Sequence, residues 1–306
     1  MHRLLLAVLV ASSALTVASA WSLRRLRARA AEKRGRAKLS ELHLLIGNRA
    51  YSSWSLRAWL ALRVAAGRPA DGGATSFAET VVELAGAGNA GQRDAIRALG
   101  SPTGKVPALR VPAQRLAAEE GEGGSSAVVF VWDSFAICEH VAELAPPSAR
   151  LWPADPTARA VARSAAAEMH SGFGALRSHL PMNTRRRLRG GGVAEDEAEA
   201  ERRCAAPGVR ADIERICELW DECRAFGRRA AGGGPFLFGH FTIADAMFAP
   251  VVLRFRTYVD DGVLPAAARD YCAAIAAMPE VREWCAAAEE ESWRIAQYEK
   301  DQAAAP

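Results

Sequence analysis

The sequence predicts two domains: an α/β domain with a mixed four-stranded sheet, followed by an all-helical domain. Three observations support this prediction. Between residues 42 and 144, short apolar runs typical of strands alternate with runs whose apolar residues repeat at helical spacing. Prolines interrupt this pattern at 145–153, which is typical of a linker. From residue 158 onward, every periodic run has helical spacing.

The first unit is expected to follow the order β-α-β-α-β-β-α, which folds as a mixed sheet flanked by helices. Its predicted strands are 42–47, 77–84, 108–111 and 127–132, and its predicted helices are 55–65, 91–99 and 134–144. A Gly-rich turn at 71–73 and a polar, Gly-rich loop at 112–127 interrupt these elements. The loop is expected to be a surface insertion between two hairpin strands.

The second unit is expected to contain helices at 158–180, 209–227, 243–259, 266–278 and 279–298. Residues 185–208 are charged and broken by glycines, so we expect a loop there, with a short helix near 194–204. We therefore place the two domains at 41–147 and 155–300.

The composition is that of a globular protein, since 50% of the residues are hydrophobic and 24% are charged. The six cysteines form no Cys-x-x-Cys pair and the histidines lack metal-ligand spacing, so neither a metal site nor a dithiol redox motif is predicted. We expect reduced and mostly buried thiols.

Charge is distributed unevenly along the chain. The first forty residues hold nine Lys/Arg and one acid, whereas the rest hold 30 basic and 34 acidic side chains, although the whole chain has a formal net charge of +4. The body of the protein is thus mildly acidic, and no nucleic-acid partner is expected.

The first forty residues have the pattern of a two-part targeting leader. Residues 1–20 begin basic, continue as an apolar run and end in Ala18-Ser19-Ala20, as a secretory signal peptide does. The apolar run is shorter than the roughly 20 residues of a membrane span. Residues 21–40 are Arg-rich and nearly free of acids, like a transit peptide, and the combination resembles the leaders of algae with secondary plastids. We expect a plastid protein, and the alternatives are the secretory pathway or a membrane tether.

Two adjacent serines, Ser52 and Ser53, stand where the first strand gives way to the first helix. A serine at this position commonly caps the helix by accepting a hydrogen bond from a free backbone N–H. Its hydroxyl also lies beside the positive end of the helix dipole, where anions bind. This stretch by itself favours the cap.

Four stretches carry a family resemblance by their order and spacing: Tyr51-Ser52-Ser53-Trp54-Ser55-Leu56-Arg57, Gly104-Lys105-Val106-Pro107, Trp132-Asp133-Ser134-Phe135-Ala136-Ile137-Cys138-Glu139 and Gly239-His240-Phe241-Thr242-Ile243-Ala244-Asp245. Together they resemble the glutathione transferase family. The first is similar to the opening of the serine-type classes, the second to the cis-proline turn and the third to the acid-Ser-x-Ala-Ile signature. The fourth is similar to the capping box of the long core helix, a folding feature. The resemblance covers 42–298 and implies a thioredoxin-like N-terminal domain and an all-helical C-terminal domain.

Longer runs such as IGNRAYSSWSLRAWLAL and FLFGHFTIADAMFAPVVLRFRTY resemble a bacterial-type subgroup that is often labelled zeta-like or maleylacetoacetate isomerase-like. The zeta opening carries Cys two residues after its first serine, where this chain has Trp54. This departure counts against isomerase chemistry more than against transferase chemistry.

The resemblance implies a role for each residue of the first two motifs. Ser52 would donate a hydrogen bond to the glutathione thiolate, which is the nucleophile. Ser53 is the alternate donor, Ser55 is a further alternative, and a pure helix cap is the other interpretation. A cis bond before Pro107 would let the Val106 backbone pair with the cysteinyl unit like an added strand, whereas a trans-Pro would simply begin a strand. Lys105 would bind the glycyl carboxylate.

Asp133 and Ser134 would bind the γ-glutamyl ammonium and carboxylate at the start of the next helix, with Ser134 also capping that helix. The alternative is a plain cap.

The second substrate is expected between the domains, against the first long helix. Met169, His170, Phe173 and Arg177 lie close to one stripe of that helix, and an acidic or carbonyl acceptor would need His170 and Arg177. A stripe of this kind is as typical of a core as of a ligand contact.

The sequence thus predicts a serine-type glutathione transferase, which adds the thiolate of its co-substrate glutathione to a small electrophile. The alternatives are a glutathione-dependent cis–trans isomerase and a non-catalytic interaction module of the same fold. Thiol–disulfide exchange is not expected, because it needs Cys at the position of Ser52. The resemblance implies a homodimer.

Overall fold

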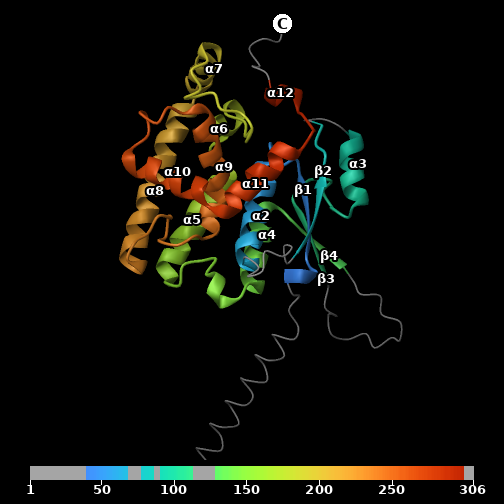
Figure 1. Cartoon of the computed structure of the whole chain (residues 1–306). Helices are drawn as coiled ribbons and strands as arrows, with labels where there is room; N and C mark the ends of the chain where they lie inside the picture. The colour runs from blue at the N-terminus through green and yellow to red at the C-terminus, as the bar shows by residue number, and fades with distance from the viewer. Residues whose placement is uncertain (1–38, 68–76, 86–89, 113–127, 300–306) are drawn as a thin grey trace, which may run out of the picture.

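A computed structural model describes residues 39–67, 77–85, 90–112 and 128–299 (Figure 1). Three predicted features lie outside the described residues: the leader up to residue 38, the Gly-rich turn at 71–73 and nearly all of the loop at 112–127. None of the helices in the described ranges is long and apolar enough to cross a membrane.

A four-stranded mixed sheet forms the centre of the N-terminal domain. Its strands lie in the order β2 (Ala78–Val82), β1 (His43–Gly47), β3 (Ala108–Pro112) and β4 (Val128–Trp132). β1 is parallel to β2 and antiparallel to β3, and β3 is antiparallel to β4. The predicted sheet is confirmed, and β1 is buried because both its edges are paired and both its faces are covered.

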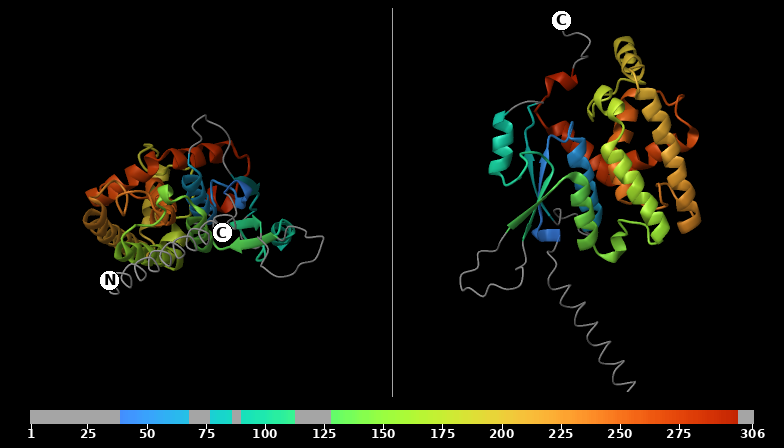
Figure 2. Two further views of the ribbon diagram at one scale, coloured as in Figure 1. Left: turned by 90° about the horizontal axis from the view of Figure 1, so that it is seen from below. Right: turned by 180° about the vertical axis from the view of Figure 1, so that it is seen from behind.

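Helices cover both faces of this sheet. α2 (Ser53–Ala66) and α4 (Ser134–Leu144) pack against each other on the face turned toward the helical domain. α3 (Ala90–Ala98) lies on the opposite face (Figures 1 and 2). Short 3₁₀ turns at Leu39–Glu41 and Pro147–Ala149 precede and follow the domain.

The cap of α4 differs from the prediction. Asp133, and not Ser134, caps this helix, because Asp133 Oδ1 accepts the backbone N–H groups of Phe135 and Ala136 at 2.9 and 3.3 Å. Asp133 has φ +74°, and this left-handed conformation directs its carboxylate over the helix end. Ser134 becomes the first helical residue, so its hydroxyl is free of the capping role.

The C-terminal domain is all helical, as predicted. Its helices are α5 (Pro156–Ser171), α6 (Gly174–His179), α7 (Ala194–Cys204), α8 (Val209–Ala231), α9 (Ile243–Tyr258), α10 (Ala266–Ala277), α11 (Pro279–Glu290) and α12 (Ala296–Glu299). α9 is central: every residue of it except Arg256 is buried, and it packs against α2, α5, α7 and α10. The predicted capping box is confirmed, since Asp245 Oδ2 accepts the Thr242 N–H at 2.8 Å.

The prediction of one helix over 158–180 is wrong. α5 ends at Ser171, and α6 begins only at Gly174. Between them, Phe173 has φ +57°, a conformation that does not continue a right-handed helix.

The predicted helix over 279–298 is also divided. α11 ends at Glu290, and an irregular segment leads to α12. Glu291 marks the division, because its carboxylate accepts the backbone N–H and a guanidinium N–H of Arg49 in the N-terminal domain. This contact draws the C-terminal segment back toward the sheet.

Candidate active site between the two domains

Two cavities adjoin each other; residues of both domains line the larger one, and residues of the N-terminal domain line the smaller one. The larger has a volume of about 540 Å³ and the smaller about 380 Å³. Trp54 at the start of α2 and Val106 before β3 belong to the walls of both cavities. A ligand that spans this shared wall would contact both domains.

The smaller cavity contains all five residues that the sequence predicts to bind glutathione. They are Lys105, Val106, Pro107, Asp133 and Ser134. The peptide bond before Pro107 is cis, as expected. Ser134 Oγ is buried and has no hydrogen-bond partner among the described residues, so it is free to bind a ligand.

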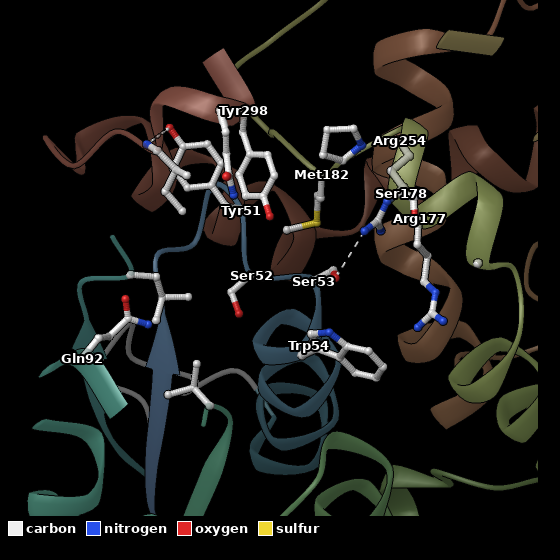
Figure 3. Close-up of a pocket in the computed structure, with 16 residues that line it drawn as sticks. Tyr51, Ser52, Ser53, Trp54, Gln92, Arg177, Ser178, Met182, Arg254 and Tyr298 are labelled. Atoms are coloured by element: carbon white, nitrogen blue, oxygen red, sulfur yellow. Dashed lines mark hydrogen bonds between the residues drawn. The ribbon is translucent and has the colours of Figure 1, made fainter. Parts of the chain in front are cut away.

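Ser52 lies at the mouth of α2, in the wall of the larger cavity (Figure 3). Its Oγ donates to Ser55 Oγ at 2.8 Å and accepts the Ser55 N–H at 3.4 Å. Ser55 Oγ in turn accepts the Gly47 N–H at 3.0 Å, which fixes the hydroxyl pair to the end of β1. Ser52 is therefore a helix cap that also faces a cavity, at the positive end of the α2 dipole.

Ser53 faces the same cavity but is held by the helical domain. Arg254 Nη2, on α9, donates to Ser53 Oγ at 3.3 Å, the bond drawn as a dashed line in Figure 3. Arg254 also donates to the carbonyls of Leu180 and Pro250 at 2.8 and 3.2 Å. Burial lowers the pKa of its guanidinium to about 10, so the group is still charged at neutral pH.

The four residues of the predicted second-substrate stripe do not share one face. Met169 is fully buried in the core, and Phe173 is buried at the break between α5 and α6. Arg177, on α6, lines the larger cavity. His170 turns toward the N-terminal domain, where its Nε2 lies 3.1 Å from Asp133 Oδ2 at the smaller cavity. The stripe fails because the helix that would carry it is broken.

His170 is in a crowded, partly buried position. Its ring makes an edge contact with Trp54, with ring centroids 5.2 Å apart. Burial lowers the pKa of His170, and the charges of Arg57 and Arg177 lower it further, while Asp133 acts in the opposite direction. A neutral imidazole that donates to Asp133 is therefore the favoured state at neutral pH.

The sequence reasoning missed several residues of the larger cavity, namely Arg254, Met182, Ile295 and Tyr298. The sequence does indicate that Arg254 faces inward. It follows Met247 by seven residues and Val251 by three, so it falls on the apolar face of its helix. The two residues from the C-terminal segment had no signal, since that segment was expected to continue a helix.

Neither cavity shows a metal or thiol centre. In the part of the chain that the structure describes, no group of three or more His, Cys, Asp or Glu side chains is arranged so that it could hold a metal ion. All six cysteines are free thiols and none lines either cavity. Burial raises the pKa of Cys138 to about 12, so this thiol is protonated at neutral pH.

Comparison with known proteins agrees with this geometry. Residues 158–287 match the family model described as the glutathione S-transferase C-terminal domain. A search of curated proteins found no match.

Solved structures resemble the chain over most of its length. A glutathione transferase homologue from Burkholderia gl BGR1, which has bound glutathione, is 19% identical, with 82% of this chain and 99% of that chain covered at a TM-score of 0.50. Glutathione transferase Omega 2C from Trametes versicolor is 17% identical, with 81% and 93% covered at a TM-score of 0.50. A maleylacetoacetate isomerase from Anaeromyxobacter dehalogenans 2CP-1 is 21% identical, with 79% and 90% covered at a TM-score of 0.46. The solved structures with a TM-score of 0.50 show that the chain has the glutathione transferase fold, and residues 158–287 match the family model of the C-terminal domain.

Proposed function

We propose that this protein is a glutathione transferase, which binds glutathione in the smaller cavity and adds its thiolate to an electrophile in the larger one. The observation that carries the proposal is the smaller cavity itself. It is lined by an exposed Lys, the backbone beside a cis-Pro, a carboxylate and a buried hydroxyl that has no hydrogen-bond partner among the described residues. Glutathione offers a complement to each of these groups.

The binding roles follow from charge and hydrogen bonding. Lys105 attracts the glycyl carboxylate, and the Val106 backbone pairs with the cysteinyl unit as an added strand would. Asp133 binds the γ-glutamyl ammonium, and the free hydroxyl of Ser134 binds the γ-glutamyl carboxylate. These contacts would place the cysteinyl sulfur near Val106, which belongs to both cavity walls.

Thiolate formation is the step that the N-terminus of α2 assists. The pKa of a free thiol is about 8.5, so the nucleophilic form is a minority at neutral pH. Ser52 can turn its O–H from Ser55 to the sulfur, and the helix dipole adds favourable potential at the same point. The thiol proton leaves to solvent, and the thiolate then attacks the electrophile.

The test is to compare Ser52→Ala with Ser53→Ala. Loss of one preorganised donor to a developing anion typically lowers kcat by about a hundredfold or more. We expect this loss for Ser52→Ala in the conjugation of a neutral aryl halide, with glutathione affinity by calorimetry nearly unchanged. If kcat falls in Ser53→Ala and not in Ser52→Ala, Ser53 is the hydrogen-bond donor to the sulfur. Wild-type protein that neither binds glutathione nor conjugates model electrophiles would be a non-catalytic module.

We also propose a homodimer and a plastid destination. The first follows from the family resemblance and is checked by sedimentation equilibrium. The second follows from the pattern of residues 1–40 and is checked by the location of a fluorescent protein fused to that segment in an alga with secondary plastids. Retention of this fusion in the secretory pathway would favour the alternative.

A further inference from the structure

A separate cavity of about 270 Å³ lies at the C-terminal end of α8. Its walls are Arg224 and Arg228 of this helix, the ring of Phe236, and glycines of the loop that follows the helix. It shares no lining residue with the two cavities described above. Figures 1 and 2 show this end of α8 directed away from α6 and α12, which border the larger cavity. The proposed transferase function therefore gives this cavity no role.

The wall of this cavity is cationic. Arg224 and Arg228 are four residues apart on α8, so they lie on one face of the helix, one turn apart. No Asp or Glu is among the described residues that line the cavity. Within the described ranges, the ion pairs of α8 belong to Arg210 and Arg215 and not to these two arginines. Two guanidinium groups thus border one cavity with no acid to balance them.

Contacts with the rest of the domain hold both arginines in place. Arg224 Nη1 donates to the carbonyl oxygen of Ala267, at the start of α10, at 2.6 Å. This bond uses only part of the guanidinium, so its other N–H groups can bind a ligand. A Cβ on Gly233 would lie 3.4 Å from Arg228 Cγ, which places the stem of Arg228 against the loop. Side chains that are already held lose less conformational freedom when a ligand binds.

The helix dipole accounts for only part of this charge. A helix C-terminus carries the equivalent of about half a negative charge, which arginines of the last turn complement. The two guanidiniums exceed that partial charge. The backbone also closes the last turn, since the N–H groups of Gly232 and Gly233 both donate to the Gly227 carbonyl. A surplus of positive charge therefore remains at the cavity.

A phosphate group fits this charge better than a carboxylate does. A phosphate dianion is balanced by two cations, and guanidiniums from successive helical turns can contact different oxygens of a tetrahedral group. A carboxylate has one charge and a planar pair of oxygens, which a single guanidinium satisfies. The half-buried ring of Phe236 adds an apolar contact beside the arginines. We propose that this cavity binds a small phosphate monoester, with Arg224 and Arg228 on the phosphate and Phe236 against the apolar part of the ester.

The test compares phenyl phosphate, inorganic phosphate and chloride at one ionic strength, with the full chain in a buffer free of phosphate. Binding is measured by calorimetry and by the rise in Tm, because a ligand that binds only the folded state raises Tm. We expect phenyl phosphate to bind more tightly than inorganic phosphate, and chloride to have no effect. The second pKa of a phosphate ester is about 6, so binding should be weaker at about pH 5 than at about pH 7.5, where the dianion predominates.

Single substitutions locate the site. Arg224→Gln and Arg228→Gln should each weaken phenyl phosphate binding by about tenfold or more, the loss typical of one charge-assisted hydrogen bond. Arg229→Gln is the matched control, because it removes the same charge from the same turn of α8 but does not line the cavity. Its affinity should equal that of the wild type. Arg228 is exposed, so Arg228→Gln keeps the test decisive even where Arg224→Gln, which loses the bond to α10, folds poorly.

The aromatic wall is tested separately. Phe236→Leu should weaken the binding of phenyl phosphate and leave that of inorganic phosphate nearly unchanged, because only the ester has an apolar part. Equal affinity for the two phosphates in the wild type would overturn the assignment to an ester.

Three further results would overturn the site itself. The first is an equal effect of chloride and phosphate, which would reduce the binding to general screening of charge. The second is wild-type affinity in both Arg224→Gln and Arg228→Gln. The third is a loss of phenyl phosphate binding in Arg177→Gln, which would place the anion in the larger cavity. Glutathione conjugation is measured beside these assays and should be unchanged in Arg228→Gln, so a failure of the transferase function is seen separately from a failure of this site.

Discussion

At the scale of single residues, His170 links the two domains, because its Nε2 lies 3.1 Å from Asp133 Oδ2 in the wall of the smaller cavity. Its lowered pKa means that the unfolded chain takes up this proton at a higher pH than the folded chain does. The free energy of unfolding should therefore fall as the pH drops from about 6.5, the ordinary value for His, through the lowered pKa. Imidazolium at this position would also compete with the γ-glutamyl ammonium for Asp133, so the KM for glutathione should rise over the same range.

The substitution His170→Gln keeps a donor for Asp133 but cannot titrate. We expect it to flatten both pH profiles, measured by urea unfolding and by initial rates between pH 5 and 8, the range in which His titrates. His179→Gln, an exposed histidine on α6, is the matched control and should keep the wild-type profiles. Unchanged profiles in His170→Gln would show that another group is responsible.

The sequence predicted most of the residues that line the smaller cavity. Lys105, Pro107 and Ser134 each lie in a short motif. Pro107 precedes β3 and Ser134 follows β4, its antiparallel neighbour, so the chain places them at the same end of these two strands. His170 and Arg254 were misplaced or missed for a different reason. Their neighbours come from the other domain, and only the packing of α9 and α5 against α2 and α4 brings them together.

At the scale of elements, the break between α5 and α6 determines where Arg177 lies. In one continuous helix, residues 169, 173 and 177 would share a face, so Arg177 would follow Met169 into the core. The actual chain turns at Gly172 and Phe173, and Arg177 reaches the larger cavity instead. Helical spacing alone could not reveal this turn, because the apolar pattern continues through it.

Gly172→Ala should damage this turn. A Cβ at Gly172 would lie 2.7 Å from the backbone oxygen of Glu168, so we expect destabilisation by about 1–3 kcal/mol, as for other overpacked sites. Gly174→Ala is the matched control, since its Cβ would meet nothing within 4 Å and its effect should stay within about 0.5 kcal/mol. Thermal and urea unfolding measure both. Equal stability of the two variants would mean that the turn relaxes at no cost.

At the scale of the whole molecule, the C-terminal segment packs back against the N-terminal domain, in addition to the linker that connects the two domains. A small cluster apart from the main core contains Ala50 and Tyr51 from the N-terminal domain and Ala288 and Ile295 from the helical domain. Ile295 and Tyr298 also line the larger cavity. The sequence predicted both domains, but it did not predict this return of the chain, because the contacts span about 240 residues and no local pattern encodes them.

Arg185 holds this C-terminal segment in place through hydrogen bonds. Its guanidinium donates to the carbonyls of Ala288, Glu291 and Trp293 at 2.9–3.0 Å and to the Tyr51 hydroxyl at 2.6 Å. Arg185→Gln removes most of these charge-assisted bonds, each of which contributes about 1.5–3 kcal/mol in other proteins. Backbone amides in 291–299 should then exchange with solvent at least tenfold faster, because local opening of this segment becomes less costly.

Arg185→Gln should affect the two cavities differently. The KM for the electrophile should rise severalfold, because one wall of the larger cavity is loosened, while glutathione affinity should change little, since the C-terminal segment does not line the smaller cavity. Arg187→Gln is the control, because the hydrogen bonds that the structure gives to the Arg187 side chain stay within its own loop, to Thr184 and Arg186. If Arg185→Gln loosens 291–299 and the electrophile KM does not move, this segment supports the fold without shaping the pocket.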